Sequence, residues 1–164
     1  MEKNITRIIL FMEELLYDIQ NKAHLTAINQ DDGTNYISVG NMQVTEDDEV
    51  ESQILRSIEN AFAKVKNALA KYAIGLGDDR ANIQMSKECD LELKLKLPKN
   101  HNNATGNLLN TAIHRYIVNS ALSEWFSITN KEEAAIYASL AALNLEEMQE
   151  AIYKRVRPTR PNNE

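Results

Sequence analysis

The feature that most constrains the fold is an apolar stripe that runs from residue 50 to residue 72 at intervals of three and four residues. This spacing places its members on one face of a helix. We expect Thr45 to be the N-cap, because acidic residues fill the following turn, and Gly75 and Gly77 to end the helix. About 30 helical residues extend roughly 43 Å, the width of a compact domain of this size. The stripe comprises Val50, Ile54, Ile58, Ala61, Phe62, Val65, Leu69 and Tyr72.

Three further segments have helical periodicity. The first runs from about Ile5 to Ala27, and the second runs from about Asn107 to Phe126 with an apolar stripe wide enough for burial on more than one side. A last helix is expected to begin at a capping box, either Thr129 to Glu132 or Asn130 to Glu133. The chain should therefore contain four helices.

Residues 90–97 alternate strictly between charged residues and leucine, which predicts a strand with Leu91, Leu93 and Leu95 on its buried face. A single strand cannot satisfy its backbone hydrogen bonds. Three partners are considered: residues 82–85, a possible short strand at Tyr36–Val39, or a strand of another subunit.

These patterns predict a mainly α fold: a four-helix domain with a small β element and an extended C-terminal arm. The helical domain should cover residues 1–156, with the β insertion at about 78–98, and the arm should cover residues 157–164. A chain of 164 residues buries roughly two-thirds of its unfolded surface, so it needs no disulfide or metal for stability. We expect no signal peptide and no membrane span, because the longest apolar run covers only residues 8–12.

The charge is −6 and the acidic residues are clustered: no Lys or Arg occurs between residues 31 and 55. Such a surface repels phosphate, which argues against tight binding of nucleic acid. It would instead let DNA slide past without sticking. The candidates for a surface that faces a DNA channel are Glu46, Asp47, Asp48, Glu49 and Glu51.

The sequence offers no set of residues typical of an enzyme or a metal site. Gly75-Leu76-Gly77 follows a helix rather than a strand, so a helix end is favoured over a phosphate-binding loop. His24, His101 and His114 lack the spacing of metal ligands, and Cys89 has no histidine near it in the sequence. We therefore expect no catalytic activity, no cofactor and no bound metal.

Two features suggest contacts with other molecules. Trp125 and Phe126 should anchor the core, although a subunit interface is the alternative, as it is for Leu91, Leu93 and Leu95. The basic tail is either a disordered end that complements the helix dipole or a docking arm stiffened by proline, with a reach of roughly 25 Å. The residues of this tail are Lys154, Arg155, Arg157, Pro158, Arg160 and Pro161.

Two stretches carry a family resemblance. Residues 114–126, 128–131 and the helix that leads to Lys154-Arg155-Val156-Arg157-Pro158 resemble the C-terminal half of small proteins encoded by phages and prophages of gut bacteria. Residues 47–62, an acidic-capped helix, resemble the corresponding helix of head–tail connector proteins, also called adaptor or neck proteins, of tailed bacteriophages. The similarity is one of helical layout over about two-thirds of the chain.

The resemblance implies a structural virion protein at the head–tail junction, assembled in the bacterial cytoplasm. Such proteins form a homo-oligomeric ring beneath the portal, continue the DNA channel toward the tail and often dock a terminal segment onto the portal. The expected partners are other copies of the chain, the portal protein and tail or neck proteins, with only non-specific proximity to DNA and no membrane. The alternatives are another neck or tail-completion protein, or a small intracellular helical module that binds a regulator or a chaperone client.

Overall fold

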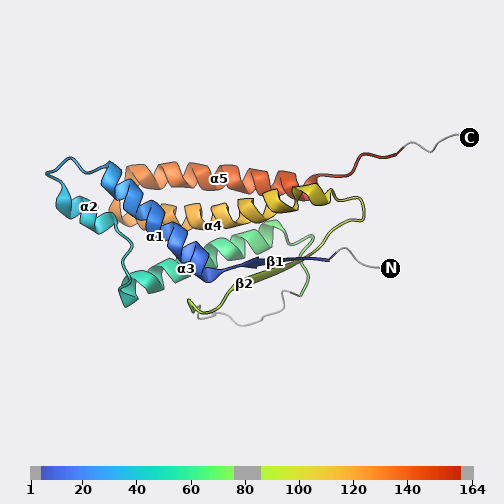
Figure 1. Ribbon diagram of the computed structural model, residues 1–164, viewed down its shortest axis with the longest axis horizontal. Helices are drawn as coiled ribbons and strands as arrows, with labels where there is room; N and C mark the ends of the chain where they lie inside the picture. The colour runs from blue at the N-terminus through green and yellow to red at the C-terminus, as the bar shows by residue number, and fades with distance from the viewer. Residues whose placement is uncertain (1–4, 76–85, 160–164) are drawn as a thin grey trace, which may run out of the picture.

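The computed structural model describes residues 5–75 and 86–159 (Figure 1). Within these ranges it is mainly α-helical with a small two-stranded antiparallel sheet, as predicted. The elements are β1 (Ile5–Leu10), α1 (Met12–Asn29), α2 (Tyr36–Met42), α3 (Asp48–Ala68), β2 (Leu91–Lys96), a short 3-10 turn (Asn103–Thr105), α4 (Gly106–Thr129) and α5 (Lys131–Tyr153).

Helices α4 and α5 form an antiparallel hairpin that is the largest packing unit of the fold (Figure 1). The hairpin turns at Asn130, whose side-chain Oδ1 accepts the backbone N–H groups of Glu132 and Glu133 at 3.1 and 3.3 Å. The predicted start of the last helix is thus confirmed. Helix α4 also contacts α1, α2 and α3, so it is buried on more than one side, as its wide apolar stripe predicts.

The N-terminal segment corrects the prediction, because residues 5–10 form a strand and the helix starts only at Met12. Ile8 and Leu10 are buried whereas Ile5, Arg7 and Ile9 are exposed, which is the alternation of a strand. β1 pairs with β2, with Arg7 opposite Lys94 and Ile8 opposite Leu93. The β element is therefore not confined to an insertion at 78–98, and β1 was not among the three predicted partners; residues 82–85 lie outside the described residues.

The region between α1 and α3 also differs from the prediction. Residues 36–39 belong to the short helix α2 and not to a strand. Met42, the last residue of α2, is hydrogen-bonded to α4: the indole Nε1 of Trp125 donates to the carbonyl of Met42 at 2.9 Å. Docking onto α4 therefore outweighs the local β preference of Tyr36-Ile37-Ser38-Val39.

Helix α3 is shorter than predicted at both ends. Asp47 occupies its N-cap position, and the Thr45 hydroxyl donates to the Asp47 carboxylate at 2.7 Å instead of capping the helix itself. The helix ends at Ala68, and the chain then turns, with Gly75 in the left-handed region at φ +70°. The 21 residues of α3 extend about 31 Å.

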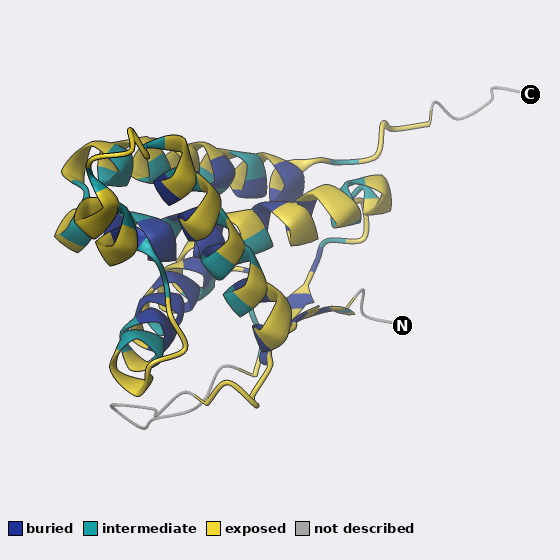
Figure 2. Cartoon of the chain, turned by 60° about the vertical axis from the view of Figure 1, so that its left-hand side comes forward, coloured by how far each residue is buried: buried dark blue, intermediate teal, exposed yellow. Residues whose placement is uncertain are grey.

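The core lies where α1, α3 and the sheet meet the α4–α5 hairpin (Figure 2). Most of the stripe predicted over residues 50–72 contributes, from Ile54 on α3 to Leu69 just after it, both of which are buried. The predicted inward-facing leucines of β2 are also confirmed, because Leu91, Leu93 and Leu95 are all buried.

Candidate interaction surfaces

The acidic residues form an exposed corner at the start of α3. Glu46, Asp47, Asp48 and Glu49 are exposed there. Glu51 differs, because it is half-buried and its carboxylate lies 3.4 Å from the ammonium group of Lys87. We call residues 46–49 the acidic corner, and Glu51 drops out of it because its charge is partly neutralised.

The residues considered for a subunit interface lie largely inside the chain. Leu91, Leu93 and Leu95 face the core, and Phe126 is 0 % exposed and stacks on Tyr137 with 5.4 Å between ring centroids. Their apolar side chains are therefore already covered within one copy, which corrects the interface alternative for these four residues and confirms Phe126 as a core anchor. Trp125 is half-buried and uses its only donor to hold α2.

The first part of the basic tail belongs to the folded domain. The backbone at 154–156 pairs with the loop at 100–102 through two hydrogen bonds, of 3.1 and 2.8 Å. The Arg155 guanidinium donates to the carbonyl of Ile152 at 2.9 Å and to the hydroxyl of Tyr72 at 3.4 Å. The arm therefore begins after Val156, with Arg157 and Pro158 exposed; Arg160 and Pro161 lie outside the described residues.

Lys154 also makes a contact within the chain. Its ammonium group lies 2.7 Å from the carboxylate of Glu150, one helical turn away, and this hydrogen bond lowers the pKa of Glu150. Both side chains are largely exposed, so the pair is solvated and Lys154 stays accessible to a partner.

Folding brings the tail beside basic residues that are distant in the sequence. The backbone amide of Lys96 donates to the carbonyl of Tyr72 at 2.7 Å, and the amide of Ile74 donates to Lys94 at 3.0 Å. The end of α3, the sheet and the tail therefore meet, and we call residues 5–7, 71–74, 92–100 and 150–157 the basic end. Its basic residues are Arg7, Lys71, Lys94, Lys96, Lys99, Lys154, Arg155 and Arg157.

The charge of the basic end contrasts with that of the remaining chain. Eight Lys and Arg residues and two acids, Glu92 and Glu150, give it a formal charge of +6. Because the whole chain carries −6, all other residues together carry −12. From the sequence, only the basic residues of the tail could be recognised as a group. The other basic residues of this end lie near the tail because of tertiary contacts.

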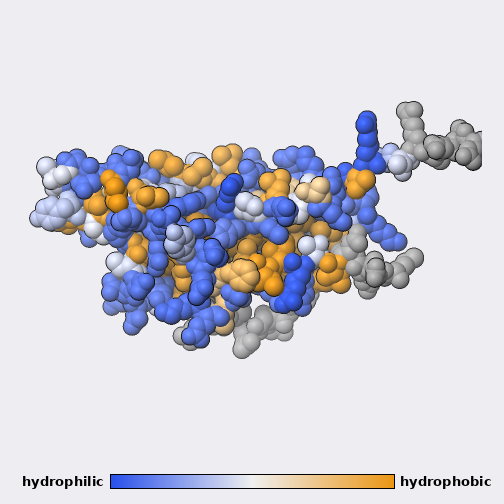
Figure 3. All heavy atoms as spheres, in the orientation of Figure 1, coloured by the Kyte–Doolittle hydropathy of each residue, from blue (hydrophilic) through white to orange (hydrophobic). Residues whose placement is uncertain are grey.

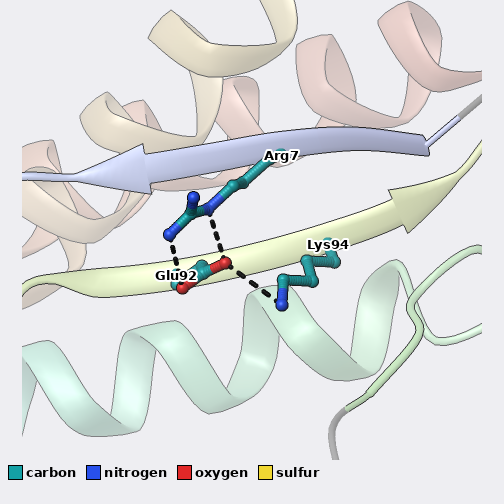
Figure 4. Close-up of polar contacts among 3 residues, drawn as sticks. All are labelled: Arg7, Glu92 and Lys94. Carbon is teal, nitrogen blue, oxygen red and sulfur yellow. Dashed lines mark hydrogen bonds and ion pairs between the residues drawn. The ribbon is translucent and has the colours of Figure 1, made fainter.

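The outward face of the sheet carries a cluster of charged side chains (Figure 4) beside exposed isoleucines. Arg7 on β1 lies 2.6 Å from the carboxylate of Glu92 on β2, and Lys94 lies 3.5 Å from the same carboxylate. The hydrogen bonds from Arg7 lower the pKa of Glu92. Beside Arg7 on the same face, Ile5 and Ile9 are 52 % and 41 % exposed.

The outer face of α5 is apolar over three turns. Ile136, Leu140 and Leu143 are 52 %, 40 % and 55 % exposed, and residues 134–145 contain no charged side chain. Exposed acids stand before and after this stretch, at Glu132, Glu146 and Glu150. Figure 3 shows apolar side chains along the upper edge of the molecule, where α5 lies.

A groove of about 620 Å³ lies among the end of β1, α1 and α4, lined by Ile9 and Leu10 together with polar side chains of the two helices. In it, His114 Nε2 and Asp18 Oδ2 are 2.7 Å apart, and Lys22 donates to the side chain of Asn119 at 3.3 Å. Burial lowers the pKa of Lys22, while the charge of Asp18 opposes that shift. His114 is thus a partly exposed residue whose contact with Asp18 links α4 to α1.

The described residues were searched for a metal site and for a membrane-spanning helix. In the described ranges, no cluster of three or more His, Cys, Asp or Glu side chains is arranged to hold a metal ion. No helix of residues 5–75 or 86–159 is long and apolar enough to cross a membrane. No protein family, characterised protein or solved structure matches the chain.

Proposed function

We propose that this chain is a structural virion protein, a head–tail connector that forms an oligomeric ring between portal and tail and continues the DNA channel. The observation that carries the proposal is the separation of opposite charges along α3. The acidic corner lies at its start and Lys71 follows its end, about 31 Å away. One subunit thus presents two chemically different ends, as a part that joins two structures requires.

The acidic corner suits a channel wall. Duplex DNA carries one negative charge per about 1.7 Å along its axis. Exposed carboxylates therefore repel DNA at every position along the channel and bind it at no particular one. Glu46, Asp47, Asp48 and Glu49 are all exposed for this role. The nearest basic residues in the sequence are Lys22 and Arg56, so the segment itself supplies no counter-charge.

The basic end suits an acidic protein surface of limited size, in this proposal the portal. Arginine binds carboxylates through forked pairs of hydrogen bonds, and Arg157 starts the exposed arm. Proline at 158 reduces the entropy lost when the arm becomes ordered. Nucleic acid is a poorer ligand, because the charge of −12 on the remaining chain opposes a long polyanion.

The first test is the assembly state and location of the protein. Native mass spectrometry should give a single closed ring, and electron microscopy should show a central channel. In particles from a strain that encodes the chain, antibodies against it should label the head–tail junction. A chain that stays monomeric or dimeric and is missing from particles would reject the connector and favour a small helical interaction module.

A further inference from the structure

Two exposed surfaces of the chain match each other in shape and charge. The first is the outer face of α5, with Ile136, Leu140 and Leu143 between acidic residues. The second is the outward face of the sheet, with Ile5 and Ile9 beside basic residues. We propose that α5 of one copy packs onto the outward sheet face of the next copy. This contact rests on the ring proposed above.

The sheet supplies the first reason for this contact. Its inner face is covered by helices, because Ile8, Leu93 and Leu95 are buried. Its outer face carries two exposed isoleucines on β1, and a two-stranded sheet gains stability when a helix packs against it. A helix from a neighbouring copy would cover this face, where residues 5–75 and 86–159 leave both isoleucines exposed.

The dimensions of the two surfaces agree. Ile5 and Ile9 are four residues apart in an extended strand, which is about 13 Å. Ile136 and Leu143 are seven residues apart in a helix, which is about 11 Å. The two pairs of apolar side chains therefore span nearly equal lengths, with Leu140 between the ends of the helical pair and Arg7 between the two isoleucines.

Charge then selects this pairing over the pairing of either surface with itself. On the sheet, Arg7, Lys94 and Lys96 outnumber the single acid Glu92. On α5, the exposed acids Glu132 and Glu146 flank the apolar stripe, whereas Glu150 is paired with Lys154. Two α5 helices packed together would oppose acids to acids, and two sheet faces would oppose cations to cations, whereas α5 on the sheet brings opposite charges together.

Because the two surfaces are different, each contact leaves one α5 and one sheet face free. Such a heterologous contact repeats until it closes a ring or continues as a filament. α5 forms the upper layer of the molecule in Figure 1, and the sheet lies on the other side of α4. The sheet's part of the basic end is then used between subunits, and the arm after Val156 stays free for the portal.

Two substitutions test the contact from its two sides. Leu143→Lys places a cation opposite the basic sheet face, and Ile9→Glu places a carboxylate opposite the acids of α5. Each variant alone should lose the ring in analytical ultracentrifugation. Ile37→Lys, which changes another strongly exposed apolar residue on α2, should assemble like the wild type.

Mixing the two variants gives the decisive measurement. The Ile9→Glu copy keeps an intact α5 and the Leu143→Lys copy keeps an intact sheet face, so the mixture should form a 1:1 complex that neither variant forms alone. Circular dichroism and thermal melting establish that each variant is folded, and Leu143→Gln or Ile9→Thr replaces a variant that is not.

The outcomes separate this contact from the proposed function. A ring that persists in either folded variant, or a mixture that stays monomeric, rejects the packing of α5 on the sheet and leaves the connector proposal intact. A wild-type chain that never assembles rejects the ring and this contact together.

Discussion

The side chain of Asn119 on α4 donates to the side chain of Asn144 on α5, with 2.7 Å between Nδ2 and Oδ1, and both residues are buried. This polar pair lies in the largest helix–helix contact of the fold. Lys22 on α1 donates to the Oδ1 of the same Asn119 at 3.3 Å. Three helices are thus joined through one amide, which favours one alignment of α4 on α5 over shifted alternatives.

We predict that Asn144→Ala destabilises the fold by about 1–3 kcal/mol, because it leaves the Asn119 donor buried without its partner. Urea denaturation measures the change. Replacing both residues, Asn119→Leu with Asn144→Leu, should recover part of the loss, since no buried amide then lacks a partner. A double variant less stable than Asn144→Ala would contradict this account.

Phe126→Ala should cost about 3–5 kcal/mol, because the ring is fully buried and stacks on Tyr137. The matched control is Phe11→Ala, whose ring is 57 % exposed and whose removal should cost far less. Equal losses for the two variants in denaturation experiments would show that burial is not what makes Phe126 important.

Trp125→Phe should loosen α2 while leaving the remaining fold intact. It keeps an aromatic ring but deletes the donor to the carbonyl of Met42, a hydrogen bond expected to contribute about 0.5–1.5 kcal/mol. Hydrogen exchange should then accelerate at the amides of residues 36–42 and stay unchanged in α4. Uniform acceleration across both helices would mean that the indole stabilises the whole domain.

Two truncations separate the arm from the folded domain. Removing residues 157–164 should leave the melting temperature unchanged but abolish binding to the portal. Removing residues 154–164 should lower the melting temperature, because it also deletes the hydrogen bonds to residues 100–102 and the contact of Arg155 with Tyr72. Portal binding that survives the shorter truncation would show that the exposed tail is not a docking arm.

Glu92 should make a small contribution to stability that disappears in acid. The hydrogen bonds from Arg7 lower its pKa, so the folded state favours the ionised carboxylate. The contribution is present above the ordinary pKa of a glutamate and is lost as the pH falls through the lowered value. Denaturation at a series of pH values should therefore separate wild type from Glu92→Gln at neutral pH and bring them together in acid.

Local signals in the sequence predicted β2 and the start of α5 correctly. Alternation in β2 and a polar cap at Asn130 are properties of a few consecutive residues, and nothing in the tertiary structure opposes them. β1 was missed because Ile5, Ile8, Ile9 and Met12 also fit the helical period, and over six residues the two periods are hard to separate. Its partner lies more than 80 residues away, which no local pattern indicates.

Some of the candidate surfaces could be predicted from the sequence and others could not. The acidic corner and the tail are contiguous in the sequence, so their charges were evident. The basic end was not, because Lys71 and Lys96 become neighbours of the tail only when Tyr72 contacts β2 and Arg155. The interface role considered for Leu91, Leu93 and Leu95 failed for the opposite reason: the partner strand and the helices that cover them come from the same chain.

The antiparallel pairing of β1 with β2 has a consequence for the newly made protein. Leu10 pairs with Leu91 and Ile5 with Lys96, so the first strand must wait for about 86 further residues before its partner exists. At translation rates of about 5–20 residues per second, this takes roughly 4–17 seconds. Throughout that interval Ile8 and Leu10 lack the partner strand beside which they are buried, and a ribosome-associated chaperone is suited to shield them. The α4–α5 hairpin is local and follows β2 in the chain, so the core closes only after both strands have been made.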